Sequence, residues 1–219
     1  MQQRATGRVA LVVGATGLVG REILAAILAD DAYAAVHVVG RRALATTHPK
    51  LSFHVVDFAA LPALPAVDDL FIALGTTIKV AGSQQAFRAV DFDAVVALAA
   101  AARASGASRL GIVSAMGASE TSLIFYNRVK GEMERAVSRL GFDSLVFARP
   151  SMLVGNRESL GQTERRGEKL ALIFMRLEAL IPANYRAIEA VRVARALVHA
   201  VKTAEKGTRI LLSGEMQAR

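Results

Sequence analysis

The stretch from Val9 to Gly20, Val-Ala-Leu-Val-Val-Gly-Ala-Thr-Gly-Leu-Val-Gly, decides the fold of this chain. Its first five residues are apolar, which is typical of a parallel strand with both faces buried. Glycines follow at positions 14, 17 and 20, and apolar side chains then recur at helical spacing from Leu18 to Leu28. The stretch therefore predicts a strand, a glycine-rich turn and a helix in direct succession.

The three glycines suit a phosphate-binding turn. A tight turn, close approach of the main chain to a pyrophosphate, and close contact between helix and strand each favour a residue without a side chain. The phosphates would lie on free N–H groups at the positive end of the helix. The spacing is G-x-x-G-x-x-G rather than the better-known G-x-G-x-x-G, and a turn that uses glycine for packing alone is the alternative. The residues predicted to hold a nucleotide here are Gly14, Thr16, Gly17, Leu18, Val19 and Gly20.

Strand and helix patterns alternate along the rest of the chain. Apolar, β-rich runs occupy residues 9–13, 36–39, 53–56, 70–74, 110–114 and 145–148. Helical patterns occupy 18–29, 83–104, 122–140, 169–181 and 190–203, and a last strand is expected at 209–213. This alternation predicts an α/β fold of the Rossmann type, a doubly wound parallel sheet with helices on both faces. We expect residues 1–219 to form a single domain, in which 151–186 make a small substrate-side or lid segment with a mobile loop at 155–168.

Composition narrows the classes of function. Hydrophobic residues make up 53% of the chain, but the most apolar stretch, 94–102, is shorter than the ~20 residues of a membrane-spanning helix. No signal-peptide pattern stands at the N-terminus, so a cytoplasmic protein without a transmembrane segment is expected. The chain has no cysteine, which excludes disulfides and a cysteine nucleophile, and its four histidines lack ligand spacing. We therefore expect no metal site.

The net charge of +8 favours anionic partners. Nucleic acid is disfavoured, because the basic residues are scattered and aromatic residues make up only 5% of the chain. A phosphorylated cofactor fits better. Where an NAD-preferring site would offer a carboxylate to the ribose 2′-hydroxyl, the predicted second strand is followed by Arg41 and Arg42. Two guanidinium groups are suited to a 2′-phosphate, which favours NADP(H); a solvated basic turn is the alternative.

Tyr126 and Lys130 are spaced so that both side chains share one face of a predicted helix. A free phenol has a pKa of about 10. A neighbouring ammonium group favours the phenolate, which makes a tyrosine usable as a general acid or base. Ser114 ends the predicted fifth strand, where its hydroxyl is placed to hold a substrate oxygen. The alternative is a solvated helix face.

These motifs resemble an atypical or extended short-chain dehydrogenase/reductase. More narrowly, the chain resembles the Tat-interacting-protein-like oxidoreductase branch and its bacterial relatives over nearly its whole length. Four segments carry this likeness: Leu74-Gly75-Thr76-Thr77, Val90-Asp91, Tyr126-Asn127-Arg128-Val129-Lys130-Gly131-Glu132, and Phe147-Ala148-Arg149-Pro150. The resemblance implies a Rossmann fold that binds NADP(H).

The resemblance also implies roles for residues outside the glycine turn. Asp57, with Phe58 beside it, matches the adenine-binding position, and Gly75 and Thr76 match the edge near the pyrophosphate and ribose. Lys130 would hold the nicotinamide ribose. The segment that borders the nicotinamide is matched by Pro150, Ser151, Met152 and Leu153. The chain departs from the pattern at Asp91, where extended members commonly carry asparagine.

Together these patterns favour an NADP(H)-dependent oxidoreductase that acts on a small carbonyl or alcohol substrate. Ser114, Tyr126 and Lys130 are its predicted catalytic residues. An NADPH-binding sensor or interaction protein with little or no turnover is the main alternative. An isomerase or dehydratase that uses the cofactor transiently is a third. The sequence leaves open whether the protein is a monomer or a homodimer.

Overall fold

The computed structural model describes residues 7–42, 44–58, 60–155, 182–203 and 205–218. Seven parallel strands of these residues form one sheet in the order β3-β2-β1-β4-β5-β6-β9. The strands are β1 (Arg8–Val13), β2 (Tyr33–Gly40), β3 (Leu51–Val55), β4 (Asp69–Ile72), β5 (Arg109–Val113), β6 (Ser144–Arg149) and β9 (Gly207–Leu212). The strand order reverses between β1 and β4, and ligands of open α/β sheets bind outside the carboxyl ends of the strands at such a point.

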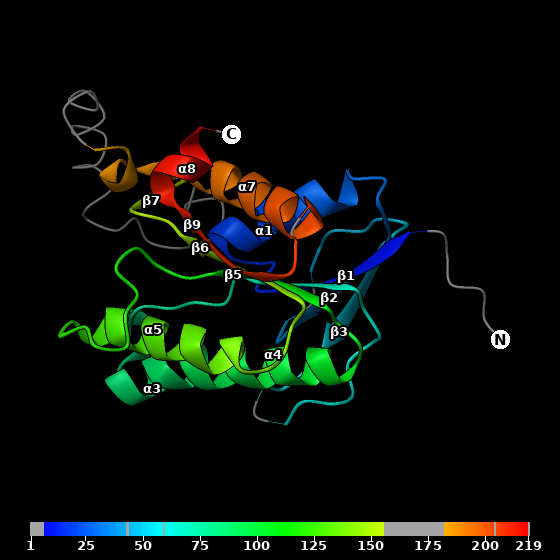
Figure 1. The fold of residues 1–219 in the computed structure, drawn as a ribbon. Coiled ribbons are helices and arrows are strands. Elements are labelled where there is room, and N and C mark those ends of the chain that lie inside the picture. Colours follow the sequence, from blue (N-terminus) through cyan, green and yellow to red (C-terminus); the bar gives the residue numbers. More distant parts are fainter. Residues whose placement is uncertain (1–6, 43, 59, 156–181, 204, 219) are drawn as a thin grey trace.

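Helices cover both faces of the sheet (Figure 1). One face carries α1 (Leu18–Leu28) and α7 (Ala190–Thr203), and the other carries α3 (Gln84–Arg88), α4 (Val95–Ala104) and α5 (Phe125–Ser138). Side chains of β1 alternate between the two cores: Ala10 and Val12 enter one, Leu11 and Val13 the other. This two-sided burial explains the unbroken apolar run of β1. The predicted Rossmann-type sheet is confirmed.

One predicted helix is built differently. The pattern at 83–104 becomes α3, a π-helical segment η1 (Ala89–Ala94) and α4. Ser83 caps α3 by accepting a hydrogen bond from the N–H of Ala86 at 3.0 Å. The wider turn of η1 carries Asp91, which is fully buried. Segments of this kind occur frequently at functional sites.

Several short elements follow no periodicity that a sequence could reveal. They are α2 (Ile78–Ala81), β7 (Leu153–Val154), the 3₁₀ helix η4 (Ala183–Tyr185), β8 (Ile188–Glu189) and α8 (Ser213–Gln217). The strands β7 and β8 pair with each other in a small parallel sheet of their own. The predicted helix at 169–181 and, apart from Gly155, the predicted loop at 155–168 lie outside the described residues.

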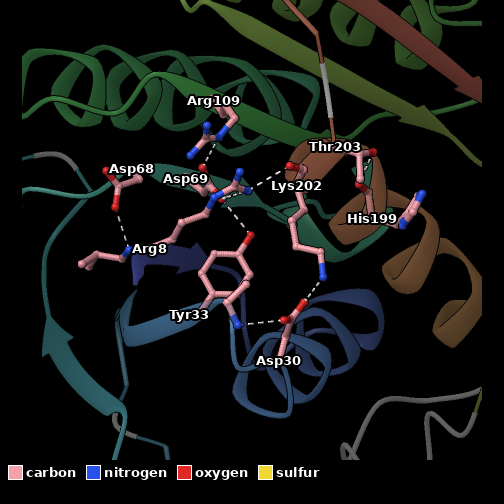
Figure 2. Close-up of polar contacts among 11 residues, drawn as sticks. Arg8, Asp30, Tyr33, Asp68, Asp69, Arg109, His199, Lys202 and Thr203 are labelled. Carbon is pink, nitrogen blue, oxygen red and sulfur yellow. Dashed lines mark hydrogen bonds and ion pairs between the residues drawn. The ribbon is translucent and has the colours of Figure 1, made fainter. Parts of the chain in front are cut away.

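A polar network closes the amino edge of the sheet (Figure 2). Asp69, at the start of β4, is fully buried and accepts hydrogen bonds from Tyr33 Oη at 2.8 Å and Arg109 Nε at 2.5 Å. Arg8 of β1 lies 3.5 Å from the same carboxylate and donates to the carbonyl of Lys202 at 3.0 Å. The network thus joins β1, β2, β4, β5 and the end of α7. Burial, followed by the charge of Asp69, raises the pKa of Tyr33.

Tyr33→Phe tests this network. Deleting the hydroxyl removes a donor from a buried carboxylate, so the free energy of unfolding should fall by about 1–3 kcal/mol at neutral pH. In the wild type, Tyr33 ionises more easily in the unfolded chain than in the folded one, so stability is lost as pH rises above about 10. Tyr33→Phe should flatten that alkaline loss in urea unfolding measured between roughly pH 9 and 11.

Tyr185→Phe is the matched control, because that side chain is 65% exposed. It should change neither the stability at neutral pH nor the alkaline slope. An unchanged alkaline slope in Tyr33→Phe would contradict the role assigned to this phenol.

Candidate active site

The predicted turn between β1 and α1 depends on its glycines. Gly14 has a φ of +85°, and a Cβ there would lie 2.6 Å from the carbonyl oxygen of Ala73. A Cβ at Gly20 would lie 2.0 Å from the carbonyl oxygen of Gly14. Without a side chain, Gly14 allows the glycine-rich loop to contact the main chain just after β4. Without a side chain, Gly20 allows the first turn of α1 to pack against that loop.

The N-terminus of α1 is suited to an anion. Gly17 is its N-cap and, having no side chain, makes no side-chain cap hydrogen bond. The first turn of α1 contains no acidic residue. Main-chain N–H groups at the start of a helix, together with the helix dipole, favour negative charge at this point.

The predicted adenosine-side residues follow β2 and β3 at the same edge of the sheet. Arg41 and Arg42 are exposed directly after β2, and neither forms an ion pair or side-chain hydrogen bond with the part of the chain that the structure describes. Asp57 is exposed just beyond β3, and Phe58 packs against the core below. The guanidinium groups are therefore placed to receive an anion.

The centre of the site is a buried ion pair. Lys130 of α5 places its Nζ atom 2.7 Å from Oδ1 of Asp91, and both side chains are nearly fully buried. The other carboxylate oxygen, Oδ2, accepts a hydrogen bond from the N–H of Thr76 at 2.9 Å. A Cβ at Gly75 would lie 3.5 Å from Oδ1 and 3.9 Å from Nζ, so the pair lies directly beneath this glycine.

The ion pair leaves hydrogen-bonding capacity unused. Oδ1 of Asp91 is close to the ammonium but has no aligned hydrogen bond within the described chain. The structure thus brings together the predicted residues Gly75, Thr76 and Lys130.

Tyr126 lies in the first turn of α5, four residues before Lys130. Its ring packs against the fully buried ring of Phe87, with 5.4 Å between the ring centroids. Gly131 allows close approach between α5 and the loop after β5, because a Cβ at this position would lie 2.2 Å from the carbonyl carbon of Ser119. The loop after β5 therefore packs directly on the backbone of α5.

Ser114, predicted as the last residue of the fifth strand, directly follows β5 and is 5% exposed. Its hydroxyl donates to Oε1 of Glu134 at 2.5 Å. Arg149 holds that carboxylate with two hydrogen bonds, from Nε at 3.1 Å and from Nη2 at 2.6 Å. Sequence reasoning missed Glu134, although its spacing from Tyr126 and Lys130 places all three on one helix face.

The predicted nicotinamide-side residues follow β6. The carbonyl of Pro150 accepts a hydrogen bond from Met116 at 3.0 Å, and Met152 is 49% exposed. Leu153 pairs with Ile188 in the small sheet. The hydroxyl of Ser151 bonds to the carbonyl of Arg186 and lies 2.9 Å from Ser213 Oγ. Residues 156–181 of the predicted lid segment lie outside the described residues.

Two further features concern the described residues as a whole. No group of three or more His, Cys, Asp or Glu side chains among them is arranged to hold a metal ion, and none of their helices combines the length and apolarity needed to cross a membrane.

His37 and His54 contact each other, with 2.9 Å between Nδ1 and Nε2. Burial, followed by the charge of His54, lowers the pKa of His37.

Two relatives place the chain in a family, although no protein-family model matches it. Protein HTATIP2 of Rattus norvegicus is 34% identical over 211 residues, which cover 93% of this chain and 85% of that protein. The mitochondrial protein fmp52 of Aspergillus fumigatus is 36% identical over 174 residues, which cover 75% of this chain and 72% of that protein.

Solved structures share the fold. A short-chain dehydrogenase/reductase family oxidoreductase from Burkholderia thailandensis matches with a TM-score of 0.68 at 19% identity, over 98% of this chain and 94% of that one. MoeE5 in complex with UDP-glucuronic acid and NAD matches with a TM-score of 0.71 at 19% identity, over 95% of this chain and 76% of that one.

The fold is the Rossmann-type fold of these solved structures. The chain belongs to the atypical, Tat-interacting-protein-like family that includes HTATIP2. The family resemblance drawn from the motifs is thereby confirmed.

Gly20→Ala tests the glycine turn. The added methyl group would lie 2.0 Å from the Gly14 carbonyl oxygen, so the turn and α1 must move apart, at a cost of more than about 2 kcal/mol. Gly17→Ala is the matched control, because its Cβ would lie 3.3 Å from the same oxygen. Thermal unfolding without ligand should show a much larger fall in Tm for Gly20→Ala. Equal Tm values for the two variants would refute this explanation of the motif.

Proposed function

We propose that this chain is an NADP(H)-dependent oxidoreductase that acts on a small carbonyl or alcohol. One observation carries the proposal: a continuous line of contacts at the carboxyl edge of the sheet. The glycine turn abuts the main chain of Ala73 and Leu74, and the next residue, Gly75, covers the Asp91–Lys130 pair. An anion-binding helix N-terminus and a buried ammonium group thus flank one stretch of β-strand end.

The residues fit a nicotinamide dinucleotide. The bare glycines let a ligand approach the main chain, and a Cβ at Gly75 would itself contact Asp91 and Lys130. The Lys130 ammonium faces Asp91 as its counter-charge and has three N–H donors, so ribose hydroxyls would supply further acceptors. When bound, the cofactor supplies the hydride chemistry.

Three side chains would carry the remaining functions, which are ribose binding, proton exchange and substrate orientation. Lys130 would hold the ribose hydroxyls. Tyr126 would exchange a proton with the substrate oxygen: in the reduction of a carbonyl, with the hydride supplied by the cofactor, the phenol would give its proton to the carbonyl oxygen, which becomes the alcohol O–H. Ser114 would orient that oxygen. To donate to that oxygen, the Ser114 hydroxyl would turn away from Glu134, to which it donates in the structure.

Arg41 and Arg42 support a preference for NADP(H) over NAD(H). They are exposed beyond β2, and the turn offers no carboxylate to a ribose 2′-hydroxyl. Guanidinium groups bind phosphate oxygens in pairs of parallel hydrogen bonds. A cytoplasmic location and a monomeric or homodimeric state remain parts of the proposal; one relative is named as mitochondrial.

A cofactor-binding sensor without turnover is the second candidate. It is favoured by the Ser114 hydroxyl, which is bound to the buried Glu134–Arg149 pair rather than exposed to a substrate. The two candidates differ in one observable. An oxidoreductase consumes NADPH with at least one aldehyde, ketone or quinone, whereas a sensor binds NADPH tightly and consumes none.

Tyr126→Phe tests the proton transfer. The variant keeps the ring that packs on Phe87 but loses the exchangeable proton, so turnover should fall by about 100-fold or more. NADPH affinity should stay within about twofold, because the phenol is assigned to the substrate. The assay is NADPH oxidation across a carbonyl panel. Full activity in Tyr126→Phe would refute the assignment.

The double variant Arg41→Ala, Arg42→Ala tests cofactor preference. Losing both guanidinium groups should weaken NADPH binding about 10- to 100-fold, while NADH binding changes by less than about twofold. Calorimetric titration with each cofactor measures both constants. A parallel loss for NADPH and NADH would show that the two arginines do not bind the 2′-phosphate.

A further inference from the structure

The Ser114 hydroxyl is engaged within the protein itself. It donates to Oε1 of Glu134 at 2.5 Å, and Ser114 is only 5% exposed. The Ser114 N–H donates to the carbonyl of Ala148 at 2.7 Å, so the main chain at the end of β5 is fixed as well. A serine hydroxyl has one proton to share. Glu134 and a substrate oxygen therefore compete for the same hydrogen-bond donor.

Glu134 is held in place by Arg149 at the end of β6. Nε of Arg149 donates to Oε1 at 3.1 Å and Nη2 donates to Oε2 at 2.6 Å, which is the strong, paired arrangement of a guanidinium group with a carboxylate. Because Glu134 is only 6% exposed, its charge needs this partner. A carboxylate fixed in this way cannot follow the serine hydroxyl when that hydroxyl rotates, so rotation breaks the hydrogen bond between them.

Helix α5 places Glu134 close to the predicted reactive side chains. Glu134 lies about one helical turn after Lys130 and about two turns after Tyr126, and the three side chains share one face of the helix. The bond from Ser114 meets that face from the carboxyl end of β5. Competition for the Ser114 hydroxyl thus takes place within the candidate active site.

The two competing acceptors differ in charge. A hydrogen bond to an ionised group is about twice as strong as one to a neutral group. A carbonyl substrate is neutral when it binds, so the Ser114 hydroxyl stays with the Glu134 carboxylate. During reduction, the carbonyl oxygen gains negative charge as hydride is added to its carbon, and it then becomes a comparable acceptor. Ser114 donates a hydrogen bond at this stage and keeps its proton, whereas Tyr126 supplies the proton that forms the alcohol.

We propose that Glu134 is a positioning residue that holds the Ser114 hydroxyl away from the substrate oxygen until that oxygen becomes charged. Glu134 thereby restrains turnover, because the stabilisation that Ser114 gives to the charged oxygen is partly offset by the lost bond to Glu134. This inference rests on the proposed function, since it assumes that Ser114 lies beside the substrate oxygen. Glu134 itself makes no contact with the substrate.

Glu134→Gln tests this restraint. A neutral amide accepts a weaker hydrogen bond, so the Ser114 hydroxyl is released more easily, and kcat/KM for carbonyl reduction should rise about 3- to 10-fold. Glu134→Asp guards against a glutamine variant that fails to fold. It keeps a charge beside Arg149 but withdraws the carboxylate from Ser114, so it should also raise kcat/KM. A merely structural role predicts a loss of activity in both variants.

The matched control is Glu120→Gln, the same change in an exposed ion pair between the loop after β5 and Arg135 of α5. It should leave kcat/KM unchanged. The assay is NADPH oxidation with the aldehyde, ketone or quinone that is reduced fastest. Thermal unfolding of each variant measures whether it is folded, and calorimetric titration should give an NADPH dissociation constant within about twofold of the wild-type value.

A double-mutant cycle tests whether Glu134 acts through the serine. In a Ser114→Ala background, Glu134→Gln should change kcat/KM by less than about twofold, because no hydroxyl remains to be released. A gain that persists in this background would show that Glu134 acts by another route and would overturn the inference.

The remaining outcomes separate this inference from the proposed function. An unchanged or lower kcat/KM in both Glu134 variants would overturn the restraint and leave the proposed function intact. Reduction that is seen only in the Glu134 variants would support the restraint. If NADPH binds but neither the wild type nor either Glu134 variant reduces any carbonyl compound, the proposed function is overturned, and this inference with it.

Discussion

The contact between Gly14 and the end of β4 is the constraint on which the site depends. Only a residue without a side chain, in a left-handed conformation, can bring the turn after β1 this close to the Ala73 carbonyl. The contact places the N-terminus of α1 beside the segment that continues into Gly75 and Thr76. These two residues lie over the Asp91–Lys130 pair, so this pair is positioned relative to that one turn.

The two edges of the sheet have different tasks. At the amino edge, buried Asp69 is satisfied by Tyr33 and two arginines, a closed network that joins neighbouring strands and α7. At the carboxyl edge, glycines replace side chains, Arg41 and Arg42 are exposed, and the buried Lys130 ammonium has Asp91 as its ion-pair partner. Polar groups that are satisfied within the protein stabilise it, and groups that are only partly satisfied are the ones available to a ligand.

The sequence predicts most of the fold because the strands are buried on both faces. Unbroken apolar runs such as Val9–Val13 predict the buried strands of a parallel sheet, and the glycine spacing predicts the turn that follows β1. The π-helical segment at Ala89–Ala94 is different, because its hydrogen-bonding pattern changes within a continuous helical periodicity. Two contacts, Asp91 with Lys130 and Ser114 with Glu134, depend on how η1, α5 and the end of β5 pack together. The spacing of residues along the chain carries no information about this packing.

The central claim is that a phosphorylated nicotinamide dinucleotide lies across the carboxyl edge of this sheet. A crystal structure of the protein grown with NADP⁺ tests it most directly. The account predicts the pyrophosphate at the N-terminus of α1, the 2′-phosphate beside Arg41 and Arg42, and the nicotinamide ribose above Gly75 within reach of Lys130. A dinucleotide bound elsewhere, or a carboxyl edge filled by the protein's own side chains, would contradict it.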